Sequence, residues 1–394
     1  MAGQSNKPSS YIRVQLLVGL FLLTLMLCGQ LIVPGIAQNR SRKPRKPAPR
    51  QSRQPPATPA PPPARSVFDL LGEPPPLPSP TPAPVQDINP GDVISIETTE
   101  VMIPVSVRDA SGRLVTHLTR DDFRVFEEEL LQPLRDLALR QVPVDAILMI
   151  DGSSSTAKNL EDFRKAAEAF SARLSSDDRL SLIQFDDTVR LLQDWTTSRF
   201  QLKRALLRIT PGVFTRFHDA LVLAAKEQYG SSTSRRAIIV FTDGIDSGRG
   251  ASLENAARAL LEAQVSVYVV SNTEISRAAK LTDLDSLMQG GQSTQRFNKL
   301  QIDDLKSGLQ ALDQSEQILE KLTAATGGRL YKPRSFDALE STYAEVAEEL
   351  RHQYALYYTP LNKKRDGDFR RVRVETTNPT HQTRTRRGYF APRS

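Results

Sequence analysis

The stretch that decides the fold is Ala146-Ile147-Leu148-Met149-Ile150-Asp151-Gly152-Ser153-Ser154-Ser155. Its unbroken apolar run is typical of a strand that is buried on both faces, and the run stops at an aspartate. Serines follow two and four residues after that aspartate. The turn therefore brings one carboxylate and two hydroxyl groups together, and hard divalent cations such as Mg²⁺ prefer oxygen ligands of this kind.

Strands and helices alternate around this stretch. Between the apolar runs, residues such as Leu160, Phe163 and Phe170 recur at helical spacing. The order predicts an α/β fold with a doubly wound, mostly parallel, Rossmann-like sheet that helices cover on both faces. Ligands bind beyond the carboxyl ends of the strands in such sheets, which is where Asp151 would lie. The expected strands are Asp145–Ile150, Leu180–Phe185, Val189–Gln193, Ala237–Thr242, Val265–Val270 and Leu330–Lys332.

Short strands are expected on both sides of the α/β region. They predict a small β-sandwich formed by N- and C-terminal strands together, with the α/β domain inserted between its halves. The strands expected before the domain are Val101–Val107, Phe123–Phe126 and Leu134–Leu139, and those after it are Tyr354–Tyr358, Phe369–Thr376 and Thr383–Tyr389. The expected organisation is a leader (1–37), a linker (38–91), an N-terminal β segment (92–143), the α/β domain (144–350) and a C-terminal β segment (351–394).

Residues 272–313 interrupt the α/β pattern with a polar segment rich in Gln and Ser. The leucines at 300, 305, 309 and 312 predict a helix at its far end. A loop of this length inside an α/β domain is either functional or disordered, and the sequence does not choose between the two.

The N-terminus is typical of an exported protein. A polar start with Lys7 and Arg13 precedes the apolar stretch Val14–Leu27, and Gly35-Ile36-Ala37 offers a small-residue cleavage site. We expect export to the periplasm, the cell envelope or the extracellular space. The alternative is an uncleaved span over Val14–Val33, with the cations that follow it holding the domain in the cytoplasm. A segment that is retained would associate the protein with a membrane or the cell envelope.

Charge and cysteine content exclude two classes of function. The net charge is +7, but residues 1–65 contain ten Lys and Arg and no acid, so the remainder has 42 basic and 45 acidic residues, or −3. A basic nucleic-acid platform is therefore not expected in the folded part. The single cysteine, Cys28, lies in the leader, which leaves the rest without disulfides or thiolate ligands. Residues 38–90 hold 17 of the 27 prolines and are interpreted as a disordered, partly polyproline II spacer.

Two further motifs complete the oxygen cluster. Thr215 stands in a loop that leads into the helix-like run beginning Phe217-His218-Asp219. The apolar strand Ile238–Phe241 ends at Thr242-Asp243-Gly244. Asp151 and Asp243 would therefore project from the same edge of the sheet, with Thr215 reaching it from a loop.

With these three motifs in order, the chain resembles the von Willebrand factor type A (VWA) domain over roughly residues 144–350. The flanks, with Asp121–Glu127 before the domain and Arg387–Pro392 after it, resemble bacterial exported proteins built around this domain. The resemblance implies a metal-ion-dependent adhesion site formed by five residues, some acting through water: Asp151, Ser153, Ser155, Thr215 and Asp243.

The expected function is non-enzymatic. A divalent cation, Mg²⁺ first and Mn²⁺ or Ca²⁺ as alternatives, would bind a protein ligand through that ligand's Asp or Glu. Phe214 and Arg216 are candidate partner contacts beside the opening, Phe217 is expected in the core, and Asp219 is expected to hold the threonine loop. Two other hypotheses stay open, namely a metal-dependent hydrolase that uses the same oxygens and a scaffold in which the site is idle.

Overall fold

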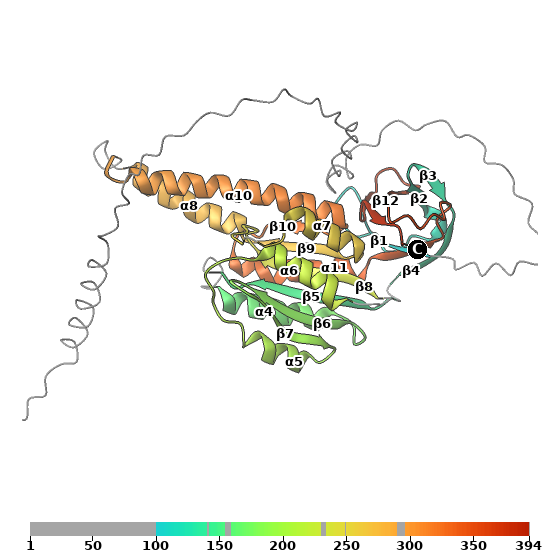
Figure 1. The fold of residues 1–394 in the computed structure, drawn as a ribbon, viewed down its shortest axis with the longest axis horizontal. Helices are drawn as coiled ribbons and strands as arrows, with labels where there is room; N and C mark the ends of the chain where they lie inside the picture. Colours follow the sequence, from blue (N-terminus) through green and yellow to red (C-terminus); the bar gives the residue numbers. More distant parts are fainter. Residues whose placement is uncertain are drawn as a thin grey trace, which may run out of the picture. The chain divides into compact units, whose positions relative to one another are not determined.

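The computed structural model describes residues 100–139, 142–153, 159–229, 234–248, 250–289 and 296–393, all within one compact unit. A six-stranded sheet with the order β10-β9-β8-β5-β6-β7 lies at its centre (Figure 1). All neighbouring pairs are parallel except β6 and β7, which are antiparallel. The strands are β5 (Val144–Asp151), β6 (Arg179–Phe185), β7 (Val189–Thr196), β8 (Arg235–Thr242), β9 (Ser266–Ser271) and β10 (Leu330–Tyr331).

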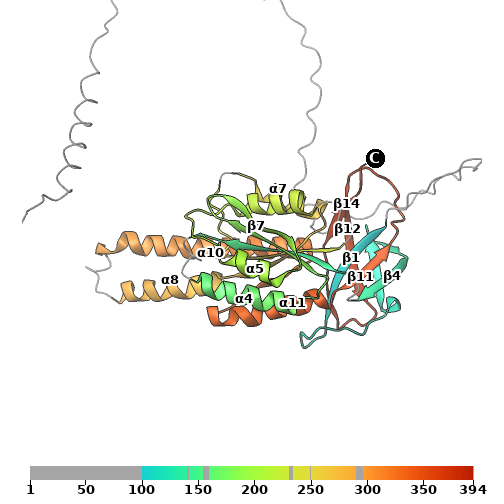
Figure 2. The same cartoon turned by 90° about the horizontal axis from the view of Figure 1, so that it is seen from below.

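Helices cover both faces of this sheet, which explains why an inner strand such as β5 is buried along its whole length (Figure 2). In β5, Leu148 belongs to the core on one face, whereas Ile147 and Met149 belong to the core on the other. One face packs against α4 (Leu160–Arg173), α5 (Arg199–Leu206) and α11 (Leu339–Arg351), and the other against α6 (Phe217–Leu223), α7 (Leu253–Glu262) and α10 (Lys299–Thr326). The predicted Rossmann-like fold class is confirmed.

The flanking strands form two four-stranded antiparallel sheets, as the split β-sandwich predicted. Their orders are β13-β1-β11-β4 and β14-β12-β2-β3. Residues from both sheets share one hydrophobic core, for example Ile103, Val125 and Tyr358. The strands are β1 (Val101–Arg108), β2 (Phe123–Glu127), β3 (Leu130–Gln132), β4 (Leu134–Leu139), β11 (Tyr354–Tyr358), β12 (Phe369–Thr376), β13 (Gln382–Arg384) and β14 (Gly388–Phe390).

The chain passes from the sandwich into the α/β region and returns to the sandwich at neighbouring positions. Leu139, the last residue of β4, pairs directly with Tyr354, the first residue of β11. Short turns of helix complete the described elements: η1 (Arg120–Asp122), the π-helical turn η2 (Ala224–Gln228) and η3 (Phe336–Ala338). The structure corrects one strand at the C-terminus, because the expected strand Thr383–Tyr389 is divided into β13 and β14, which belong to different sheets.

The polar interruption at 272–313 is helical where it is described. The helix α8 (Thr273–Met288) starts directly after β9, and α10 returns alongside it, so that the two form a hairpin (Figures 1 and 2). The predicted helix at the far end of the segment is confirmed, whereas α8 was not predicted. No helix in the described part of the chain is long and apolar enough to span a bilayer. The leader and the linker lie outside the described residues.

Candidate metal centre

Three neighbouring strands place polar residues at the carboxyl edge of the central sheet. Asp151 ends β5, Thr242 ends β8, and Asp186 follows the last residue of β6. In the register of the sheet, Asp151 pairs with Phe185 on one side, and Ile150 pairs with Phe241 on the other. The strand order therefore brings these residues to the same edge.

Asp151 is the most buried member of the cluster, with no exposed surface. Its Oδ1 accepts a hydrogen bond from the Ser153 backbone N–H at 2.9 Å, and its Oδ2 accepts one from the Thr242 hydroxyl at 2.8 Å. The hydroxyl of Ser153 also donates to this carboxylate. Ser153 is itself buried, with 5 % of its surface exposed. The expected hydroxyl at position two of the turn therefore lies beside the carboxylate.

The electrostatics at this edge fit a cation. Burial raises the pKa of Asp151 to about 6, and repulsion from the nearby Asp243 carboxylate adds to the rise. Two buried carboxylates close together disfavour each other's charge, and a divalent cation between such groups removes that repulsion. Asp243 is also buried, with 7 % of its surface exposed. Among the described residues, no group of three or more His, Cys, Asp or Glu side chains is placed to hold a metal ion. A cation here would therefore bind carboxylates together with hydroxyl groups.

The Asp243 turn is held from two directions. Its Oδ1 accepts a hydrogen bond from the Ile245 backbone N–H at 3.1 Å, and its carbonyl oxygen accepts one from the Ser315 hydroxyl on α10. Gly244 has a φ of 72°, which is the left-handed region, and a Cβ there would overlap Ser315 and Leu319. Only glycine fits at this position without strain.

The Thr215 loop is tied to the loops that carry the two aspartates. The backbone N–H of Thr215 donates to the Ser247 hydroxyl at 2.8 Å, and its carbonyl accepts from the backbone N–H groups of Ser247 and Gly248 at 3.1 Å. Gly212 in the same loop donates its N–H to the carbonyl of Gly152 at 2.7 Å. Thr215 is 6 % exposed. Three separate segments therefore interlock around one edge of the sheet.

Four of the five expected ligands are described, and they come from these interlocked segments: Asp151, Ser153, Thr215 and Asp243. Ser155 lies outside the described residues. The expectation for Phe217 is confirmed, since it is fully buried. Asp219 accepts a hydrogen bond from the Ala251 N–H at 2.6 Å, which connects α6 to the loop before α7.

The two candidate partner contacts lie on the rim. Phe214 is 60 % exposed, and its backbone N–H donates to Asp187 Oδ1 at 3.0 Å. The neighbouring Val213 is 66 % exposed. The Arg216 side chain is about half exposed, and its Nε lies 3.5 Å from Asp219 Oδ2. An exposed apolar side chain and a half-exposed cation therefore flank the buried Thr215 in the chain.

The sequence interpretation missed Asp186, a buried residue that supports this edge. Its Oδ2 accepts hydrogen bonds from Gln184 Nε2 at 2.7 Å and from an Arg190 guanidinium nitrogen at 2.6 Å. A Cβ at Gly152 or at Gly212 would overlap the side chains of Gln184 or Asp186. The signal was available, because Asp186 follows a buried strand as Asp151 and Asp243 do.

Comparisons with known proteins agree with this geometry. The family model of the von Willebrand factor type A domain matches residues 145–315. No curated protein matches the sequence.

The solved structures that match parts of this chain include three proteins. Proximal thread matrix protein 1 from the mussel byssus, with a zinc-occupied MIDAS motif, is 16 % identical with a TM-score of 0.41, and the match covers 56 % of this chain and 48 % of that one. BatB from Bacteroides thetaiotaomicron is 26 % identical (TM-score 0.29; 32 % and 66 % covered). The vWF domain of the pilus tip protein Mfa5 from Porphyromonas gingivalis is 25 % identical (TM-score 0.25; 27 % and 39 % covered).

The chain spans about half the length of the mussel protein. The family match starts at the second residue of β5, includes every segment that contributes to the oxygen cluster, and ends at Ser315, which binds the Asp243 carbonyl. Residues 145–315 of this chain therefore form a von Willebrand factor type A domain.

Proposed function

We propose that the carboxyl edge of the central sheet binds a divalent cation and that the cation captures an Asp or Glu of a partner protein. The observation that carries the proposal is the pair of buried carboxylates, Asp151 and Asp243, held at one edge together with Thr215. Asp151, Ser153, Ser155, Thr215 and Asp243 would hold the ion, some through water. Mg²⁺ is the first candidate, with Mn²⁺ and Ca²⁺ as alternatives.

The donor set explains why a carboxylate is the expected partner group. Two carboxylates neutralise a divalent cation, and the hydroxyls add oxygen ligands without charge. Because the set then carries no surplus negative charge, a partner carboxylate can bind the cation without strong repulsion. Phe214 and Arg216 border the oxygens and would contact the partner around that carboxylate. The function that follows is adhesion or assembly. The protein would be exported, and its N-terminal segment would attach it to the cell envelope.

The test is capture of a partner by the immobilised full chain from an extract of the native host, with Mg²⁺ and with EDTA. We expect one protein to be retained in Mg²⁺, released by EDTA, and absent with Asp151→Asn. Replacement of the captured protein's Asp or Glu that contacts the cation, by Asn or Gln, should abolish retention. Retention that is equal in EDTA and in Mg²⁺ would refute the proposal.

A metal-dependent hydrolase using the same oxygens is the second candidate. The observation that favours it is His218, whose Nδ1 lies 2.7 Å from Asp246 Oδ2 in the loop that follows the Asp243 turn. A histidine oriented by a carboxylate can serve as a general base. A screen of ester, phosphoester and peptide substrates with Mg²⁺ tests this function. Turnover that disappears in both Asp151→Asn and His218→Ala would establish it in place of adhesion.

A further inference from the structure

The hairpin of α8 and α10 extends beyond the edge that carries the candidate metal centre (Figures 1 and 2). Ser315 of α10 donates a hydrogen bond to the Asp243 carbonyl and marks the level of that edge. The segment Lys299–Gln314 precedes it in the same helix. At 1.5 Å per residue, that segment projects about 24 Å. We call α8 together with residues 296–314 the arm.

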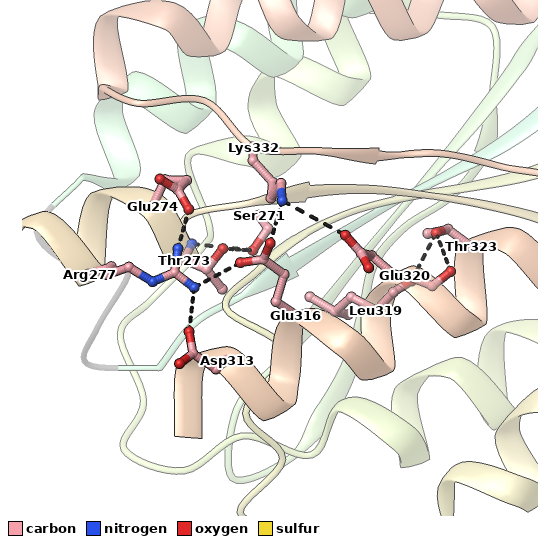
Figure 3. A network of polar contacts seen from close by, with 10 residues as sticks. All are labelled: Ser271, Thr273, Glu274, Arg277, Asp313, Glu316, Leu319, Glu320, Thr323 and Lys332. Atoms are coloured by element: carbon pink, nitrogen blue, oxygen red, sulfur yellow. Dashed lines mark hydrogen bonds and ion pairs between the residues drawn. The ribbon is translucent and has the colours of Figure 1, made fainter. Parts of the chain in front are cut away.

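The base of the arm is fixed by an ion-pair network (Figure 3). Arg277 of α8 pairs with Glu274, with Asp313 at 2.9 Å and with Glu316 at 2.9 Å. Lys332, next to β10, pairs with Glu316 and lies 3.8 Å from Glu320. The network joins both helices of the arm to the end of the central sheet, so the direction of the arm is defined by the fold.

The outer part of the arm exposes large apolar side chains. Phe297 is 91 % exposed, Leu300 is 86 % exposed, and Leu281 and Met288 are 49 % and 43 % exposed. These four lie within 20 residues of sequence, whereas side chains such as Ile302 are buried between the two helices. Exposed apolar side chains grouped in this way mark an interaction surface.

Charge divides the arm into two zones. The tip, residues 286–289 and 296–302, contains Arg296 and Lys299 and no acid. The shaft below it, residues 280–285 and 303–306, contains four aspartates and two lysines, for a net charge of −2 against +2 at the tip. All four aspartates are exposed: Asp283, Asp285, Asp303 and Asp304. The charge of the tip of one arm is therefore complementary to the charge of the shaft of another.

We propose that the arm binds the arm of a second copy of this chain, with the tip of each against the shaft of the other. A two-fold axis satisfies both contacts at once, and two-fold dimers are the commonest symmetric oligomers. Two helical hairpins pack in this way to give a four-helix bundle. Phe297, Leu300 and Met288 would then be buried, while Arg296 and Lys299 face aspartates. An anionic membrane fits less well, because Asp303 follows Lys299 after one helical turn.

The size of the arm sets the strength of the contact. The zones that pair, residues 296–306 and the facing part of α8, are about 16 Å long, so a face two helices wide offers about 350 Å² per copy, compared with roughly 800 Å² per partner in stable complexes. The dimer is therefore weak and concentration-dependent. It becomes significant when chains are concentrated on a surface, and it would join two candidate metal centres in one assembly.

The test is sedimentation velocity of the full chain across a concentration series, using charge reversal. One variant reverses the tip (Arg296→Glu with Lys299→Glu), and a second reverses the shaft (Asp303→Lys with Asp304→Lys). We expect each alone to self-associate at least tenfold more weakly than the wild type. An equimolar mixture should regain the dimer, since both contacts again join opposite charges. Every variant retains residues 1–99, so any association through that region is common to all.

Leu300→Glu should weaken self-association at least tenfold, whereas Phe200→Glu, an exposed phenylalanine on α5, should leave it unchanged. Circular dichroism of each variant verifies the fold. A wild type that stays monomeric throughout the series overturns the proposal. A dimer whose strength the charge reversals leave unchanged overturns it too, as does an equimolar mixture that does not regain the dimer. Binding to an anionic membrane would also overturn it, and would appear as wild-type protein that sediments with phosphatidylglycerol vesicles while Leu300→Glu does not.

Discussion

Asp151 illustrates how the chain positions a charged side chain in its core. Burial and the nearby Asp243 raise its pKa to about 6. Hydrogen bonds from Ser153 and Thr242 act in the opposite direction by stabilising the carboxylate. The proposed cation would resolve this competition, because it would stabilise both carboxylates at once.

At this scale, Thr242→Val should destabilise the protein. The Thr242 hydroxyl donates to Asp151 Oδ2 at 2.8 Å and accepts from the Gly244 N–H at 2.9 Å. Valine has nearly the same shape but leaves a buried donor and a buried acceptor without this partner. We expect the free energy of unfolding in urea to fall by about 1–3 kcal/mol. The exposed Thr380→Val serves as the control, and a Thr242→Val midpoint equal to that of the wild type would contradict the role given to this hydroxyl.

Single residues were predictable where strand ends mark them. The apolar run before Asp151 and the one before Asp243 fix both positions, and Thr215 follows from its place before a helix. Asp186 was missed although it also follows a buried strand, because the sequence does not show that its carboxylate contacts the side chains of Gln184 and Arg190. The part of the site that depends on contacts between distant loops could not be derived from spacing alone.

At the scale of elements, the strands of the sheet were the most predictable because two covered faces require unbroken apolar runs. The helix α8 was not predicted. Thr273 is its only fully buried residue among those described, so the helical apolar period that reveals α4 is weak in α8. Its position depends on polar contacts, which leave little periodic signal in the sequence.

The arm base gives a prediction of its own. Arg277→Met removes the guanidinium that joins Glu274, Asp313 and Glu316. We expect backbone amides of α8 and the outer half of α10 to exchange roughly 3–10-fold faster, because local opening becomes easier, while β5 and β8 are unchanged. Hydrogen–deuterium exchange with mass spectrometry measures this. Lys306→Met, an exposed change on the arm, is the control, and equal exchange in both variants would show that the network does not fix the arm.

At the scale of the whole molecule, a buried carboxylate joins the sandwich to the α/β region. Glu349 of α11 has no exposed surface and accepts from Arg108 of β1 at 2.7 Å, from Arg329 at 2.9 Å and from the Ser106 hydroxyl at 3.1 Å. Burial would raise its pKa, but the two guanidinium groups outweigh burial and hold the pKa below its ordinary value of 4.5. The split sandwich was predictable from strands at both ends, whereas this contact was not.

The depressed pKa of Glu349 predicts an acid-sensitive junction. A carboxylate with a lowered pKa stabilises the fold above its unfolded pKa, and that stabilisation is lost as the pH falls through the folded pKa. Glu349→Gln should lower the free energy of unfolding by about 3 kcal/mol at pH 7, since the arginines lose their buried partner. The difference from the wild type should shrink between pH 5 and pH 3. Urea denaturation curves of both proteins at pH 7, pH 5 and pH 3 measure this difference. A constant difference across this range, or an equal effect of the half-exposed Glu348→Gln, would contradict the assignment.

The most direct test of the proposed cation site is calorimetric titration of Mg²⁺ into the full chain and into two variants, Asp151→Asn and Asp177→Ala. Asp177 is the control position, because it is an exposed aspartate at the opposite end of the sheet. We predict one ion bound per chain by the wild type and by Asp177→Ala, and none by Asp151→Asn with its fold intact by circular dichroism. Mg²⁺ at about 100 times its dissociation constant should also stabilise the wild type by about 2.7 kcal/mol. Equal Mg²⁺ binding by the wild type and Asp151→Asn, or no binding of Mg²⁺, Mn²⁺ or Ca²⁺ by the wild type, would contradict the claim that this edge holds a cation.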